Sequence, residues 1–145
     1  MTGYAFTSYD KENMARVIGA ALPISFKQSV EICRFVNNKG TNDAKKILHR
    51  VIEGEVAIPF RRYNWDLSHK KKTGPARYPK KASKEFIKLI ENVEANAQFK
   101  GLNTSNLVIT HISAHKAGKS LHFGRKSRRK MKRTNIEIVV SEKVR

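Results

Sequence analysis

Two stretches of alternating apolar residues in the last third of the chain flank a strongly basic segment. LVITHISA, residues 107–114, and NIEIVVS, residues 135–141, each alternate as half-buried β-strands do. Between them, residues 115–133 read HKAGKSLHFGRKSRRKMKR, with nine lysines or arginines and no acid. A basic run between two strands is a connection within a fold, whereas charged tails usually lie at a free end. The pattern therefore predicts a β-hairpin with an extended basic arm over about residues 107–141.

The charge balance of the chain restricts its partners. Among 145 residues there are 30 lysines and arginines against 12 aspartates and glutamates, which gives a formal charge of +18 and an isoelectric point near 10.3. A chain this basic repels itself unless a polyanion neutralises it, and nucleic acid is the polyanion that such a domain typically binds. A hydrophobic content of 39% is ordinary and sufficient for one core, so residues 1–145 are predicted to form a single domain.

Membrane, redox and metal signals are weak. No apolar run approaches the ~18 residues that a membrane span needs, and we find no signal-peptide core or lipidation motif. The single cysteine, Cys33, cannot form an internal disulfide, which fits a reducing cytosol, and its apolar helical setting favours a buried side chain over a nucleophile. The histidines have neither cysteine nor carboxylate beside them, so we expect no metal and no cofactor. They are His49, His69, His111, His115 and His122.

Three amphipathic stretches predict helices. The first runs from about Phe26 to Asn37, with Ser25 and Gln28 spaced as a capping box. The second begins at Thr41 and continues at helical spacing until Gly54. The third has Pro79 in its first turn and ends near residues 99–101. With one strand expected in the first 24 residues, the fold class is α+β: three helices packed on a small antiparallel sheet with a long protruding β-hairpin.

The connection between the second and third helices, about residues 59–81, mixes cations with aromatic residues and contains one acid, Asp66. A loop of this length is uncommon unless it is functional or disordered. Cations pair with phosphates and aromatic rings stack on bases, so this composition is typical of an RNA contact. The candidate RNA-binding residues here are Arg61, Arg62, Tyr63, Trp65, His69, Lys70, Lys71, Lys72, Arg77, Tyr78, Lys80 and Lys81.

The basic arm is the second predicted RNA contact. Two strands of about nine residues each would reach roughly 30 Å beyond the core, and an isolated hairpin of that length is not stable in water. We expect RNA packed around the arm to order it, with arginines gripping phosphates in bidentate fashion and Phe123 available to stack. The prediction is recognition of shape and backbone, without a base code. The candidate residues are His115, Lys116, Lys119, His122, Arg125, Lys126, Arg128, Arg129, Lys130, Lys132 and Arg133.

The letters AGKS at 117–120 resemble the end of a nucleotide-binding P-loop. That motif requires a glycine five positions before Gly118, where this chain has Ser113, and a helix that receives the phosphate. The residues that follow show no apolar periodicity and run into a strand. Glu85, Glu91 and Glu94 lie on the third predicted helix, where Glu91 and Glu94 among lysines are typical of solvated ion pairs. We find no catalytic constellation and expect no enzyme.

The order of these segments resembles a known family. SFKQSVEICRFVNNK, DAKKILHRVIEGEVAIPFRRYN, LVITHISAH, the Gly-Arg pair at 124–125 and IEIVV follow one another as in the universal ribosomal large-subunit protein of family twenty-two, in its archaeal and eukaryotic form. The resemblance covers about residues 15–142. Its most specific blocks are ARYPKKA at 76–82 and ENVEANAQFKGL at 91–102.

The resemblance implies an α+β domain on the outer surface of the large ribosomal subunit, with its hairpin running inward through ribosomal RNA to the wall of the nascent-peptide exit tunnel. It also implies a role in subunit assembly, contacts with neighbouring ribosomal proteins and with the nascent polypeptide, and a location on the cytoplasmic ribosome, with no homo-oligomer expected. Relatives usually carry a longer tip with a Pro-Arg step, where this chain has residues 120–123, SLHF. The tunnel-proximal tip is expected at Gly118, Lys119, Ser120, Leu121, His122, Phe123, Gly124 and Arg125.

A second class of function is open to the same sequence. The first two helices, joined by a short Asn/Lys/Gly turn, permit a helix-turn-helix shape in which the second helix would read DNA. The chain would then be a free nucleic-acid-binding regulator. The exposed face of that helix would carry fewer charges than either basic connection, which favours the ribosomal alternative. Its residues are Asn42, Lys45, Lys46, His49 and Arg50.

Overall fold

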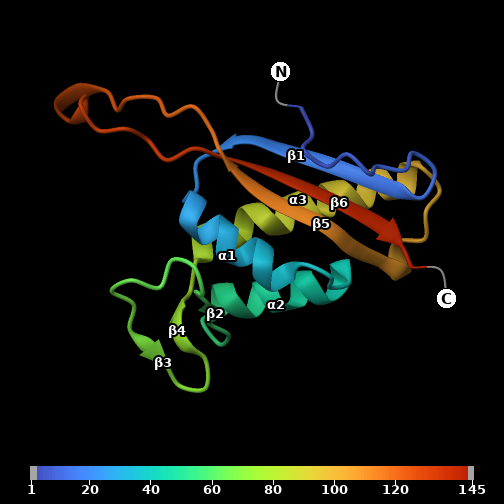
Figure 1. The fold of residues 1–145 in the computed structure, drawn as a ribbon, viewed down its shortest axis with the longest axis horizontal. Coiled ribbons are helices and arrows are strands. Elements are labelled where there is room, and N and C mark those ends of the chain that lie inside the picture. Colours follow the sequence, from blue (N-terminus) through green and yellow to red (C-terminus); the bar gives the residue numbers. More distant parts are fainter. Residues whose placement is uncertain (1–2, 144–145) are drawn as a thin grey trace.

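The computed structural model describes residues 3–143 and contains two small antiparallel sheets and three α-helices (Figure 1). The α+β prediction is confirmed. The main sheet has the order β1-β6-β5, and the second has the order β2-β4-β3. In chain order the strands and α-helices are β1 (Met14–Leu22), α1 (Phe26–Val36), α2 (Thr41–Glu53), β2 (Ile58–Pro59), β3 (His69–Lys70), β4 (Gly74–Arg77), α3 (Lys80–Phe99), β5 (Leu107–Lys116) and β6 (Thr134–Glu142).

All three helices form where their apolar spacing predicts them, but two details at their ends differ. Ser25 occupies the N-cap of α1 without a side-chain hydrogen bond, so the predicted capping box is wrong. The Ser25 carbonyl instead accepts hydrogen bonds from both the backbone nitrogen and the hydroxyl of Ser29, each at 2.9 Å. Pro79 is the N-cap residue of α3 and lies just outside its first turn. Gly54 ends α2 with a φ of 95°, a left-handed conformation that favours glycine.

The main sheet buries its inner face against the helices. Ile136 and Ile138 of β6 and Phe86 and Ile90 of α3 are all fully buried in one core cluster. On β5 the register shifts at Thr110, because Ile109 pairs with Val140 but His111 already pairs with Val139. A β-bulge of this kind changes the phase of alternation, so both Ile109 and Ile112 are buried.

The N-terminal segment covers the outer face of the same sheet. Glu137, on the outer face of β6, is only 2% exposed. Its carboxylate accepts hydrogen bonds from the backbone nitrogens of Ala5 at 2.9 Å and Phe6 at 3.1 Å. The Phe6 ring stacks on His111 with a centroid separation of 4.9 Å. The middle strand of the sheet is therefore covered on both faces, by helices on one side and by an extended segment on the other.

The predicted loop at 59–81 is more ordered than the sequence indicates. Three short strands, β2, β3 and β4, form the second sheet within this segment, and the sheet lies beside α1 and α2 (Figure 1). Ile58 and Phe60 are buried members of the core cluster and attach this sheet to the core. Strands of two to four residues are too short to show a period-2 pattern, which is why sequence reasoning treats the segment as a connection.

Candidate nucleic-acid interface

The basic arm leaves the main sheet after the pair Lys116 and Thr134, where the regular β5–β6 ladder ends. Beyond it the two sides are joined by one isolated bridge, Leu121 with Lys130, and by irregular backbone hydrogen bonds such as His122 N to Arg129 O at 2.8 Å. The prediction of two continuous nine-residue strands is therefore wrong. No residue of 117–133 is buried, so no packing holds the arm flat, and its like charges repel.

The end of the arm is a short helical turn. Residues 124–126 form a 3₁₀ turn that begins at Gly124, whose φ of 63° suits glycine. The Gly124-Arg125 pair thus lies at the end of the arm, as the resemblance implies, and the Phe123 ring just before it is 87% exposed. Within residues 3–143, none of the ion pairs involves an arm residue. The nine cations of the arm are therefore available to an external anion.

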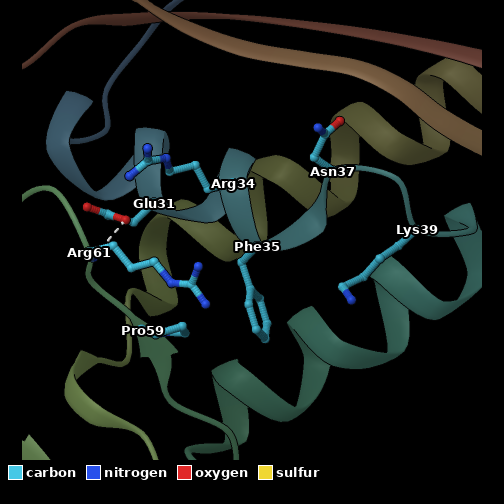
Figure 2. A pocket seen from close by; sticks show the side chains of 7 residues that line it. All are labelled: Glu31, Arg34, Phe35, Asn37, Lys39, Pro59 and Arg61. Atoms are coloured by element: carbon cyan, nitrogen blue, oxygen red, sulfur yellow. Dashed lines mark hydrogen bonds between the residues drawn. The ribbon is translucent and has the colours of Figure 1, made fainter.

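A buried acid organises the basic loop. Glu31 of α1 is 1% exposed, and its carboxylate accepts three backbone hydrogen bonds, from Arg61 at 3.2 Å, Arg62 at 2.8 Å and Tyr63 at 3.0 Å. Figure 2 shows the bond to Arg61 as a dashed line. We call this arrangement the Glu31 clamp. The clamp has no sequence signature, because the partners of this single acid within SVEICRFV lie about thirty residues away.

Some of the candidate aromatic rings are exposed, and others already contact neighbouring side chains. Trp65 is 85% exposed, so its face is open to a base. Tyr63 instead packs edge-on against Phe26 at 6.4 Å, with the Lys27 ammonium 5.6 Å from its centroid. Tyr78 lies beneath Lys70 at 5.9 Å. Of the predicted stacking residues, Trp65 and Phe123 have the most exposed rings.

A continuous basic groove joins the loop to the base of the arm. One hollow of about 400 Å³ is lined by Phe26, Lys27, Lys116, Lys119, Lys132 and Arg133. An adjoining hollow of about 210 Å³ shares Lys27 and Lys132 and adds Tyr63, Trp65 and Arg77. The arm and the second sheet project at the same end of the molecule (Figure 1), and α1 begins between them with no acid in its first turn. The positive end of that helix adds to the potential of the groove.

Sequence reasoning missed Phe26 and Lys27 as members of this groove. Their position at the start of a predicted helix was visible, but the approach of the arm to that helix was not. Lys81, one of the predicted RNA-binding residues, lines a separate hollow with His122, Lys130 and Lys132. This hollow is therefore bounded by residues of the arm and by the first turn of α3.

Other predicted residues are not brought into the groove. His115 lies on the outer face of the main sheet, where its Nε2 is 2.9 Å from the Ser113 hydroxyl, which is in turn 3.3 Å from Nε2 of His111. Within residues 3–143, no group of three or more potential ligands from His, Cys, Asp and Glu is placed to hold a metal. Ten further candidate RNA-binding residues lie outside the groove on exposed or half-buried parts of the surface. On or near the second sheet they are His69, Lys70, Lys71, Lys72, Tyr78 and Lys80, and at the end of the arm they are Arg125, Lys126, Arg128 and Arg129.

The helix-turn-helix alternative gains nothing from the geometry. Lys45 of α2 is paired with Glu94 of α3 at 2.7 Å, and Arg50 is paired with Glu55 at 3.0 Å. Two of the five residues expected to face DNA are therefore already neutralised. The AGKS segment continues into the arm and is not followed by an α-helix before β6, so it lacks the architecture of a P-loop.

Comparison with known proteins decides between the two classes of function. The family described as Ribosomal protein L22p/L17e matches residues 17–141, which include all three helices, the arm, the second sheet and all but the outermost residues of the main sheet. This chain belongs to that family. The L22p/L17e domain here is thus the main sheet, its helices and the two basic projections together. Membership in a ribosomal-protein family also agrees with the expectation that the chain is not an enzyme.

Archaeal relatives extend the L22p/L17e match over almost the whole chain. A protein of Archaeoglobus fulgidus is 40% identical over 145 residues, covering 94% of this chain and 93% of its own length. One from Methanoculleus marisnigri is 41% identical and covers 97% of both chains, and one from Thermoplasma acidophilum is 42% identical and covers 98% and 96%. Each is named large ribosomal subunit protein uL22.

Among residues 3–143, none of the helices is both long and apolar enough to cross a membrane.

Proposed function

We propose that this L22p/L17e protein is a structural component of the large ribosomal subunit and binds ribosomal RNA through the loop at 59–81, the arm and the groove between them. The observation that carries the proposal is the arm itself. It bears nine cations and no acid, it has no buried residue between 117 and 133, and it projects from a well-packed scaffold. A segment of this kind is stabilised only when a polyanion surrounds it.

The resemblance supports a further part of the proposal. The tip, residues 118–125, reaches the nascent-peptide exit tunnel and contacts the emerging polypeptide, and the body contacts neighbouring ribosomal proteins as a single copy. The arm and loop bind different segments of RNA and thereby aid subunit assembly. The contacts read shape and backbone, because the groove and the arm are lined mainly by lysine and arginine.

Replacing the arm tests the central claim. In the arm-replacement variant, residues 118–132 give way to Asn-Gly, a two-residue turn that can join Ala117 to Arg133 because their backbones already hydrogen-bond at 3.3 Å. We expect an unchanged melting temperature, since no buried residue is removed, and weaker binding to large-subunit RNA with a shallower dependence on salt. The salt slope falls by about 0.7–0.9 for each phosphate that the protein no longer neutralises.

A matched control separates charge from shape. In it, the arm keeps its length but the seven cations between 118 and 132 become glutamine. If this variant, which keeps only Lys116 and Arg133 of the nine arm cations, binds RNA as the natural protein does, the charge of the arm is not the basis of binding. If the arm-replacement variant unfolds, or binds with the natural salt slope, the division into scaffold and RNA-binding arm is wrong. A photo-crosslinker at Phe123 tests the tunnel claim in assembled ribosomes, where adducts with nascent chains are expected.

A further inference from the structure

A second groove lies beside the Glu31 clamp, and none of the arm residues lines it. It runs between the C-terminal half of α1 and strand β2, has a volume of about 470 Å³, and is lined by Arg34, Phe35, Lys39 and Arg61 among others (Figure 2). Arg34 and Lys39 are not among the predicted RNA-binding residues. We call this hollow the α1–β2 groove.

The charged side chains that line the groove are positive, with one exception. Its one carboxylate, Glu31, is buried, and its two oxygens already accept three backbone hydrogen bonds. Within residues 3–143, Arg34, Lys39 and Arg61 are in none of the ion pairs. Figure 2 shows Arg61 and Lys39 extending toward the Phe35 ring from opposite sides. Three like charges gathered in one hollow repel one another unless an anion lies between them.

Phe35 is not placed to stack on a base. Its side chain is half-buried, and the Lys39 ammonium lies 5.7 Å from its ring centroid. A ligand in the groove therefore meets two guanidinium groups and an ammonium, with the ring and Pro59 as an apolar floor. This chemistry suits phosphate oxygens, which guanidinium groups bind in bidentate fashion and lysine binds as a point charge.

We infer that the α1–β2 groove is a second RNA-backbone site, which binds phosphodiester groups without reading sequence. The inference rests on the proposed ribosomal function and adds a surface to it. The clamped segment favours RNA over an acidic protein, because it lines both grooves: Arg61 faces the α1–β2 groove, while Tyr63 faces the groove beside the arm. The loop would then lie between two RNA segments, with Glu31 setting their separation.

The test uses the full chain with the large-subunit RNA fragment that it protects from nuclease. The double variant Arg34→Gln and Lys39→Gln removes two charges from the groove. Its control, Lys46→Gln and Lys84→Gln, removes two charges from exposed lysines on α2 and α3 that have no ion-pair partner among residues 3–143. We expect the groove variant to lower the salt slope of binding by about 2, and the control to leave it unchanged.

Footprinting distinguishes this inference from the function on which it rests. The groove variant should lose hydroxyl-radical protection at nucleotides that the arm-replacement variant still protects. Equal salt slopes for groove variant and control, or an unchanged footprint, would overturn the second site while leaving arm binding intact. Loss of a crosslink to a neighbouring ribosomal protein with no change in the RNA footprint would overturn it in favour of an acidic protein partner. Failure of the natural chain to protect any large-subunit RNA would instead overturn the proposed function. Melting curves of both variants confirm that each is folded.

Discussion

The carboxylate of Glu31 lies 2.8 Å from the backbone nitrogen of Arg62, so a buried acid holds in place a loop whose side chains are cationic. Attraction between the charges of the two side chains is not needed for this contact. The carboxylate binds the backbone and leaves the arginine side chain directed elsewhere. A negative charge can therefore support a surface that binds a polyanion, provided that it is buried and its oxygens are occupied.

Replacing Glu31 should loosen the loop before it affects the core. Glu31→Ala leaves three backbone nitrogens without their acceptor and is expected to lower the free energy of unfolding by about 1–3 kcal/mol. Glu31→Gln keeps the shape and one acceptor oxygen, so it should fall between the natural protein and the alanine variant. Denaturant unfolding gives the order, and amide exchange at Arg61, Arg62 and Tyr63 should accelerate most. An alanine variant with natural exchange rates at these amides would contradict the clamp.

Glu137 has the corresponding role for the N-terminal segment. Glu137→Ala should release residues 3–13 from the outer face of the sheet, because the Ala5 and Phe6 amides lose their acceptor. Faster amide exchange at those two residues is the expected readout. Glu91→Ala, on the exposed face of α3, removes the same charge and serves as the control. If both variants exchange alike at Ala5, the carboxylate does not fasten the segment.

Cys33 should be inert in the folded protein. Burial raises the pKa of its thiol well above the ordinary 9.0, because the thiolate would be desolvated within the core. A thiol reagent is expected to react slowly at neutral pH and rapidly once denaturant unfolds the chain. The thiol also makes stability depend on pH. Below pH 9.0, the ordinary pKa of a cysteine, both the folded and the unfolded protein keep the proton, and the free energy of unfolding is not reduced. Above it the unfolded chain alone loses the proton, so the free energy of unfolding decreases as the pH rises. Rapid labelling of the native protein would show that the thiol is accessible.

Gly19 of β1 packs against the side chain of Leu89 on α3. A Cβ atom there would lie 2.8 Å from Leu22 Cδ1 and 3.0 Å from Leu89 Cδ1. Alanine meets only the ends of flexible side chains and should cost little, whereas Gly19→Val is expected to lower the free energy of unfolding by about 1–3 kcal/mol through overpacking. Ala20→Val, at the exposed neighbouring position, is the control. Equal melting temperatures for the two valine variants would refute this packing argument.

The elements that could be predicted from the sequence are those whose apolar periodicity extends over many consecutive residues. Each helix repeats its apolar stripe over three or more turns, and β6 alternates over its whole length, so these elements need no tertiary information. The arm was predicted as a connection for the same reason, because strands bound it on both sides. Its irregular course was not, since the end of a ladder depends on what packs against it.

The rest depends on contacts between distant residues. Strand β2 pairs with β4, and both are too short to show a period. The Glu31 clamp and the α1–β2 groove join α1 to residues that follow two elements later, and the bulge at Thr110 changes which residues of β5 face the core. These features have no sequence signature. For the strand pairing and the clamp the reason is that a hydrogen bond to a backbone nitrogen places no requirement on the residue that carries the nitrogen.

The chain order of the main sheet has a consequence for how the protein is made. β6 lies between β1 and β5 but follows both along the chain. The first strand therefore has no sheet partner until β6 is synthesised, after every cation of the loop and of the arm has been added to the chain. During its own translation the chain passes through a stage that is both highly basic and unable to close its core. Closure of the main sheet is thereby tied to the synthesis of β6, and until then the basic loop and arm belong to a chain whose sheet is incomplete.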